Sequence, residues 1–167
     1  PHAARAVTEP VLDALGVAHA AGLVHRDVKP ENVLVDEKDG WSMKITDFGI
    51  ARSKDQARLT KTGLVMGTAQ YLSPEQARGE VVDSRSDVYS AGCLLYELLT
   101  GRPPFIGDSP VAVAYQHVQE DPTPPSELIN DDLTERERLG VDAVVLTAMA
   151  KHPADRYQSA WEMGDDL

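Results

Sequence analysis

Two short segments, residues 25–32 (HRDVKPEN) and 45–49 (ITDFG), carry the side chains best suited to chemistry. Asp27, Asn32 and Asp47 supply hard oxygen atoms, which Mg²⁺ prefers, and Mg²⁺ is usually held by one or two carboxylates together with substrate phosphates. Lys29 places a mobile positive charge two residues after Asp27. Phosphoryl transfer needs a metal ion, a cation near the moving phosphoryl group and a carboxylate near the attacking hydroxyl. A lone aspartate is more simply a solvated surface charge, but the whole ordered set favours a phosphotransferase.

The elements that precede and hold these segments are a helix and short strands. Apolar residues in 3–20 recur at spacings of four, four and three, which predicts a helix with one buried face: Val7, Val11, Leu15 and Ala18. Pro10 conflicts with a regular helix, so either the helix kinks there or its regular part begins near it. Gly22 is a plausible end.

Strand-like runs occupy residues 23–24, 33–35 and 43–46, and Asp39-Gly40 predicts a turn between the last two. Residues 50–66 have weak periodicity and many polar groups, which predicts a long loop. A small β-ribbon near residues 33–46 therefore lies between the two chemically interesting segments.

The second half of the chain is predicted to be helical. Residues 86–100 form the helix expected to be most buried, capped by Ser84 or Ser86 and ended by Thr100-Gly101. Its predicted core face contains Val88, Ala91, Leu94 or Leu95, and Leu98. Ser109-Pro110 opens a helix to about Gln119, three prolines force an extended connection at 122–125, and helices follow over 141–150 and 159–167. The predicted class is α+β, mainly α-helical with a small β-ribbon patch.

Composition limits the partners. The chain has 167 residues, which fits one domain, and a net charge of −11, which gives no electrostatic attraction to nucleic acid or anionic lipid. Its one cysteine, Cys93, excludes an intrachain disulfide and suits a reducing compartment. We find no run of about 18 apolar residues and no signal-peptide layout. These features predict a cytoplasmic location and no membrane contact within the chain, although a longer parent protein with a single membrane span stays open.

Residues 25–32 resemble the catalytic loop of protein kinases, and Asp47-Phe48-Gly49 resembles their metal-binding motif. The resemblance implies a fold like the C-terminal lobe of a kinase, ATP as the phosphate donor, and Mg²⁺ (or Mn²⁺) held by Asn32 and Asp47. It implies that Asp27 accepts the proton of the substrate hydroxyl, and that Lys29 contacts the transferring phosphate and marks a Ser/Thr kinase. Leu34 would underlie the adenine, with Lys29 and Asp47 also near the nucleotide.

The resemblance also implies structural roles. His25 and Phe48 look like members of an apolar stack that aligns the two lobes, and Gly49 completes the metal motif. Residues 67–75 look like the end of an activation segment spanning 47–75, in which Thr68 is placed against Asp27 and Lys29, and Ser73 stands where alanine is commoner. Glu75 would form a buried ion pair with Arg156. Asp87 would receive backbone N–H groups of the catalytic loop, and simple helix capping is its alternative role.

The narrower resemblance is to bacterial Ser/Thr kinases of the receptor type with extracellular cell-wall-binding repeats, carried by residues 67–79, 83–89 and 107–121. Arg26 precedes Asp27, as in kinases whose activation loop is ordered by phosphorylation. We therefore expect autophosphorylation at Thr60 and Thr62, most simply between two kinase molecules. The alternative is that both are ordinary loop threonines.

No Gly-x-Gly-x-x-Gly motif occurs in the sequence. The resemblance therefore implies a kinase C-lobe (residues 1–167) without its N-lobe and with a truncated last helix. We expect such a chain to be inactive alone and to expose Phe48 and Leu34. Two alternatives stay open: a pseudokinase or scaffold module, and a small-molecule kinase of the antibiotic-phosphotransferase kind, which lacks an activation segment like 67–75.

Overall fold

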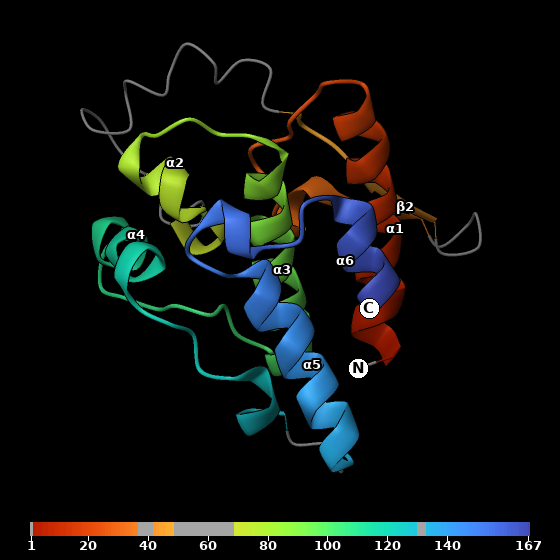
Figure 1. The fold of residues 1–167 in the computed structure, drawn as a ribbon, viewed down its shortest axis with the longest axis vertical. Helices are drawn as coiled ribbons and strands as arrows, with labels where there is room; N and C mark the ends of the chain where they lie inside the picture. Colours follow the sequence, from red (N-terminus) through yellow and green to blue (C-terminus); the bar gives the residue numbers. More distant parts are fainter. Residues whose placement is uncertain (1, 37–41, 49–68, 130–132) are drawn as a thin grey trace.

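The computed structural model describes residues 2–36, 42–48, 69–129 and 133–167 (Figure 1). Within them the protein is mostly helical with one two-stranded sheet, so the predicted α+β class is confirmed for these residues. The predicted turn at 39–40 and the predicted loop at 50–66 lie outside the described residues, as do Gly49, Thr60, Thr62 and Thr68.

The first helix, α1, runs from His2 to Ala20 and continues through Pro10. Val11, Leu15 and Ala18 are buried as predicted, whereas Val7 is only half-buried. Gly22 has a φ of 77°, a left-handed conformation suited to the end of a helix. The strand predicted at residues 23–24 is wrong. The backbone N–H of Leu23 donates to the Ala18 carbonyl at 2.9 Å, closing the end of α1 instead of joining a strand.

The β-ribbon consists of β1, Val33–Asp36, and β2, Ser42–Ile45, each shifted by one residue at one end or both from its prediction. The strands are antiparallel, and Val33 pairs with Ile45. A 3₁₀ turn, η1 (Pro30–Asn32), leads into β1, and the Thr46 N–H donates to the Asn32 carbonyl at 2.9 Å. An antiparallel ribbon brings its entry and exit together, so Asn32 and the segment that contains Asp47 meet at one end.

Helix α3, Ser84–Thr100, forms the centre of the core, with α1, α5 and α6 packed against it (Figure 1). Eleven of its 17 residues are buried, which confirms the prediction that it is the most buried helix. It begins two residues earlier than predicted, and neither predicted serine is the cap. The Asp83 side chain caps it by accepting from the Arg85 N–H at 2.9 Å. Leu98 also differs from its prediction, because it is 41% exposed.

Close packing of α3 on α5 requires glycine at position 92. A Cβ there would lie 2.9 Å from the Ala148 Cβ and 3.0 Å from the Met149 Cγ. Helix α5 spans Glu135–Ala148 and begins six residues before the predicted start. Thr134 and Glu137 form a capping box, a local signal for that earlier start.

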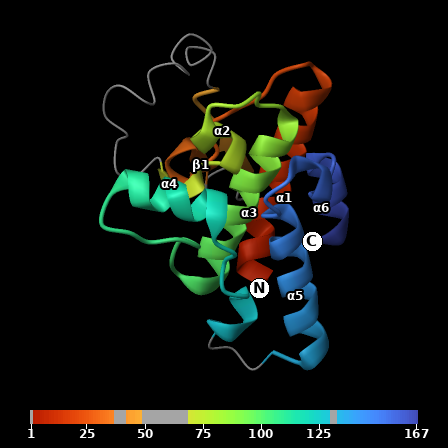
Figure 2. The ribbon, with the colours of Figure 1, turned by 60° about the vertical axis from the view of Figure 1, so that its left-hand side comes forward.

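Helix α4, Pro110–Gln119, has the predicted bounds and the predicted serine cap, Ser109. Helix α2, Pro74–Arg78, was not predicted, and it follows a 3₁₀ turn, η4 (Ala69–Tyr71). Figures 1 and 2 show α2 and α4 on one side of α3, with α1 and α6 on the other. Two further turns, η5 (Pro125–Glu127) and η6 (Pro153–Asp155), precede α5 and α6, the latter spanning Ala160–Asp166. None of the described helices combines the length and hydrophobicity required of a membrane span.

Candidate active site

The loop between α1 and β1 gathers three of the predicted site residues. The Lys29 ammonium lies 3.1 Å from Asp27 Oδ2. The Asn32 side-chain amide donates to the Asp27 backbone carbonyl at 2.7 Å and to Asp27 Oδ2 at 3.2 Å. The side chains of Lys29 and Asp27 are 17% and 12% exposed, so this cluster is shielded but reachable from solvent. A carboxylate, an ammonium and an amide are thus held within one short stretch of chain.

The donor atoms at this end of the ribbon are of the kind that Mg²⁺ prefers. The amide nitrogen of Asn32 faces Asp27, which leaves its side-chain oxygen as the atom suited to a cation. Asp47 is exposed, follows β2 by two residues and has a φ of 59°. Thr46 ties the two sides together, because its N–H and its hydroxyl both donate to the Asn32 carbonyl. Among the described residues no group of three or more His, Cys, Asp or Glu side chains could hold a metal, and a site of two protein ligands plus phosphates is the kind Mg²⁺ favours.

His25 and Phe48 are in ring contact beside this cluster. Their ring centroids are 4.6 Å apart, with 53° between the ring planes. His25 Nε2 lies 2.8 Å from the Thr46 carbonyl, which can only accept, so Nε2 carries the proton and Nδ1 accepts from the Asp27 N–H. The expectation that Phe48 is exposed is wrong, since this contact leaves it half-buried, whereas Leu34 is 53% exposed as expected.

Asp87, in the first turn of α3, holds the backbone of the loop that contains Asp27. Its two carboxylate oxygens accept the backbone N–H groups of His25 and Arg26, each at 2.7 Å. The expected contact with the loop is therefore present, while the cap of α3 is Asp83. His19 Nε2 also lies 2.8 Å from Asp87 Oδ2. Sequence reasoning missed His19, and its place in the last turn of α1 gives no local signal of a partner 68 residues away.

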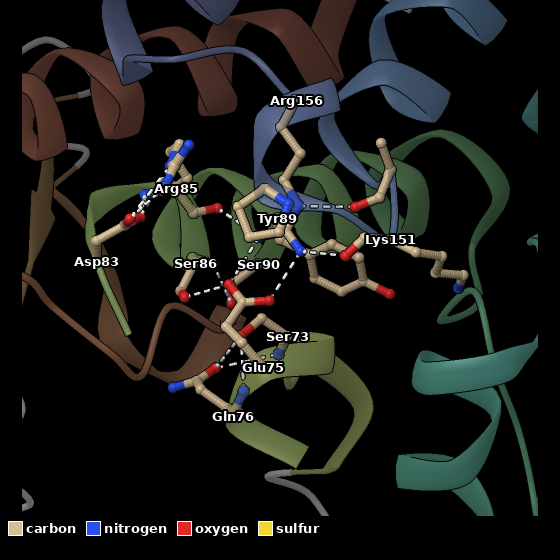
Figure 3. Close-up of polar contacts among 12 residues, drawn as sticks. Ser73, Glu75, Gln76, Asp83, Arg85, Ser86, Tyr89, Ser90, Lys151 and Arg156 are labelled. Atoms are coloured by element: carbon tan, nitrogen blue, oxygen red, sulfur yellow. Dashed lines mark hydrogen bonds and ion pairs between the residues drawn. The ribbon is translucent and has the colours of Figure 1, made fainter. Parts of the chain in front are cut away.

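Glu75 and Arg156 form the expected pair, drawn in Figure 3. Two guanidinium nitrogens donate to the two carboxylate oxygens of Glu75 at 2.7 and 2.8 Å. The remaining N–H groups of Arg156 donate to backbone carbonyls of three residues: Arg85, Ala150 and Lys151. All five guanidinium N–H groups are therefore used, and the guanidinium also lies 4.9 Å from the centre of the Tyr89 ring.

The charge of Glu75 is stabilised despite its burial. Burial by itself raises the pKa of this carboxyl, but hydrogen bonds from Arg156 and Ser86 outweigh it, and the pKa ends below its ordinary value. A buried charge without such partners would be costly. The pair therefore joins α2 to the turn before α6 and stays charged at neutral pH.

Gln76 connects α2 to the loop that contains Asp27. Its side-chain amide donates to the Arg26 carbonyl at 3.0 Å, while its side-chain oxygen accepts from the Ser73 N–H at 3.0 Å. The Ser73 hydroxyl oxygen accepts a hydrogen bond from the Gln76 N–H, which completes a capping box. Sequence reasoning missed Gln76, although Ser73 followed three residues later by Gln76 is the local signal of such a box.

Comparison with known proteins agrees with this geometry. Residues 1–155 match the family described as the protein kinase domain. The chain belongs to the protein kinase family. It spans about a quarter of the length of the curated relatives that it matches.

Those relatives are bacterial kinases by name. A probable serine/threonine-protein kinase of Corynebacterium efficiens is 62% identical over 169 residues, covering 100% of this chain and 25% of that protein. The probable serine/threonine-protein kinase PknB of Corynebacterium glutamicum is 61% identical over 160 residues, covering 95% of this chain and 24% of the relative. The serine/threonine-protein kinase PknB of Mycobacterium tuberculosis is 54% identical over 172 residues, covering 100% of this chain and 26% of the relative. The predicted resemblance to bacterial Ser/Thr kinases is confirmed at this level.

Proposed function

We propose that this chain is the C-lobe part of a bacterial Ser/Thr protein kinase that transfers the γ-phosphate of ATP to Ser or Thr hydroxyls of proteins. The observation that carries the proposal is the cluster of Asp27, Lys29 and Asn32, joined to Asp47 at the same end of the ribbon. These are the groups that phosphoryl transfer requires, in a kinase-family chain.

In the proposed reaction the substrate hydroxyl oxygen attacks the γ-phosphorus, and the bond to the β,γ-bridging oxygen breaks to release ADP. Asp27 accepts the hydroxyl proton. Lys29, 3.1 Å from Asp27, offsets negative charge on the moving phosphoryl group. Asn32 and Asp47 would hold Mg²⁺, which supplies neutralisation of phosphate charge when bound. Thr68, adjacent to the described η4 turn, is proposed to contact Asp27 and Lys29, and Leu34 to lie under the adenine.

The rest of the site is proposed to come from an N-lobe, because no Gly-x-Gly-x-x-Gly motif is present to cover the phosphates. The chain alone is therefore proposed to transfer little phosphate. We also propose a cytoplasmic location, where ATP is supplied, and a receptor-type parent with cell-wall-binding repeats. Regulation is proposed to run through Arg26 and phosphorylation of Thr60 and Thr62 in a kinase–kinase dimer.

The test is a radiolabelled-ATP assay on myelin basic protein with three proteins: this chain, a version extended by the native N-lobe, and the extended version with Asp27→Asn. The extended, unmutated protein is expected to transfer phosphate and this chain alone to transfer little. Asp27→Asn should reduce the rate of the extended protein by about 10²–10⁴-fold, because the general base is lost. A folded extended protein that transfers nothing would overturn the proposal and favour a pseudokinase. If the extended protein labels an aminoglycoside but not myelin basic protein, the result would indicate a small-molecule kinase.

A further inference from the structure

His117, in α4, is a buried residue outside the cluster described above. Its side chain is fully shielded from solvent. Nε2 lies 3.1 Å from the Gln70 carbonyl, and Nδ1 lies 2.8 Å from the Tyr89 hydroxyl. The carbonyl can only accept, so Nε2 donates to Gln70 and the Tyr89 hydroxyl donates to Nδ1. One neutral tautomer of His117 thus joins three elements: α4, α3 and η4.

The backbone of His117 is also held in place. Its carbonyl accepts from the Lys151 ammonium at 3.1 Å. The Phe105 ring packs edge-on against the His117 ring, with centroids 4.8 Å apart, and Lys151 lies 4.8 Å from the centre of the same Phe105 ring. Burial, and then the nearby Lys151 charge, lower the pKa of His117 to about 3. The imidazole therefore stays neutral, and its hydrogen-bond directions stay constant, at neutral pH.

The segment that accepts the hydrogen bond of His117 leads to the proposed base, Asp27. We call residues 69–76 the bridging segment. Its Gln70 carbonyl accepts a hydrogen bond from His117 Nε2, and its Tyr71 carbonyl accepts one from the Ser90 hydroxyl at 2.7 Å. Its far end reaches the catalytic loop through Gln76 and the Arg26 carbonyl, one residue before Asp27. A displacement of the bridging segment therefore changes the surface next to Asp27, where a polypeptide substrate must present its hydroxyl.

We propose that His117 is a positioning residue that holds the bridging segment in the place required for polypeptide substrate, acting from α4 through the Gln70 carbonyl. The inference rests on the proposed function and adds a residue and an element to it. The groups proposed to hold the nucleotide, Leu34 and Asp47, belong to the ribbon and its exit. Loss of His117 should therefore raise the KM for a peptide and leave the KM for ATP nearly unchanged.

The variants are made in the protein that carries the native N-lobe. His117→Phe keeps the ring volume but removes both hydrogen bonds, leaving the Gln70 carbonyl and the Tyr89 hydroxyl without a partner. His117→Gln keeps a donor near the Nε2 position and is the milder variant, included in case His117→Phe does not fold. The exposed His152 supplies matched controls, His152→Phe and His152→Gln.

Two measurements are made on each protein: hydrogen exchange of peptides covering 69–73, and the KM values for a peptide substrate and for ATP. For His117→Phe we expect faster exchange in 69–73 and a rise of about fivefold to a hundredfold in peptide KM, the range for a buried group left without its partner. His117→Gln should fall between it and the unmutated protein, and the His152 variants should change neither quantity.

Unchanged exchange and unchanged peptide KM in His117→Phe would overturn the inference, as would equal rises in both KM values with uniformly faster exchange, which would indicate a purely structural role. If the unmutated protein transfers no phosphate, the proposed function fails instead. The exchange measurement then still decides whether His117 holds the bridging segment.

Discussion

The Glu75–Arg156 pair and the Asp27–Lys29–Asn32 cluster both contain opposite charges, but they differ in solvent exposure and in how many of their polar groups have partners. The side chains of Arg156 and Glu75 are 0% and 5% exposed, and every guanidinium N–H has a partner. The cluster is partly open to solvent, and beside it Asp47 is exposed. A closed set of contacts suits a permanent link, whereas an open set leaves donor atoms for a ligand.

Positive backbone φ angles at non-glycine residues also occur on the side of the open cluster. Among the described residues, the two non-glycine residues with positive φ are Arg26, at 67°, and Asp47, at 59°. Both lie in or beside the candidate site: Arg26 in the loop that holds Asp27, Lys29 and Asn32, and Asp47 in the segment proposed to hold Mg²⁺. Left-handed backbone costs of order 1–3 kcal/mol at an ordinary residue and persists where surrounding contacts hold it. Here the holding contacts include Asp87, which accepts the Arg26 N–H, and Gln76, which donates to the Arg26 carbonyl.

The largest effect on stability is expected from breaking the closed pair. Arg156→Met leaves the buried Glu75 charge without its partner and should lower the free energy of unfolding by about 3–5 kcal/mol. Urea denaturation measures this. The double variant Glu75→Leu with Arg156→Met removes both charges and should recover most of the loss. An Arg156→Met variant as stable as the unmutated protein would show that the pair does not stabilise the fold.

A smaller effect is expected where the two regions meet, at Asp87. Asp87→Asn replaces one acceptor oxygen by an amide that faces a backbone N–H, so we expect a loss of about 1.5–3 kcal/mol in unfolding free energy. Phosphate transfer by the N-lobe-extended protein should fall as well, because the catalytic loop loses an anchor. Asp83→Asn, at the N-cap of the same helix, is the control, since asparagine caps as well as aspartate and the ion pair that it loses with Arg85 is partly exposed. Equal behaviour of the two variants would contradict the anchoring role.

Acidification should destabilise the protein through His117, whose buried hydrogen bonds, like those of the Glu75–Arg156 pair, are closed to solvent. Its pKa is lowered from 6.5 to about 3, so the unfolded chain binds a proton first as pH falls below 6.5. The neutral imidazole therefore contributes stability that is fully present above pH 6.5 and is lost progressively towards pH 3. Between pH 7 and pH 5 the expected loss is about 2 kcal/mol. Urea denaturation at both pH values should show this loss in the unmutated protein and a smaller one in His117→Gln; equal losses would assign the effect to other groups.

The smallest effect on stability is expected in the open cluster. Asp27→Asn removes a partly exposed ion pair with Lys29, and such pairs contribute about 0–1 kcal/mol. The unfolding free energy should therefore change by less than about 1 kcal/mol, in contrast to the large loss of activity expected for the same variant. A loss of unfolding free energy as large as that of Arg156→Met would show that the open cluster stabilises the fold as much as the buried pair does.

Local signals explain most of what could be predicted. The serine cap at Ser109 and the glycine end at Gly101 act within one helical turn, so the ends that they mark were predicted correctly. The early start of α5 and the whole of α2 were missed, although both carry capping boxes. The strand predicted at 23–24 failed because a two-residue apolar run cannot show whether a partner strand exists.

By itself, the sequence determined the chemistry of the candidate site, because Asp27, Lys29 and Asn32 lie within six residues and one short loop brings their side chains together. Kinase resemblance supplied the pairing of Glu75 with Arg156, 81 residues apart. Only the tertiary structure decided that His19 lies against Asp87 and that His117 donates to the Gln70 carbonyl. These partners are 68 and 47 residues apart in the chain. The physical reason is that hydrogen bonds between distant residues depend on how whole helices pack, and helix packing has no signature in local residue spacing.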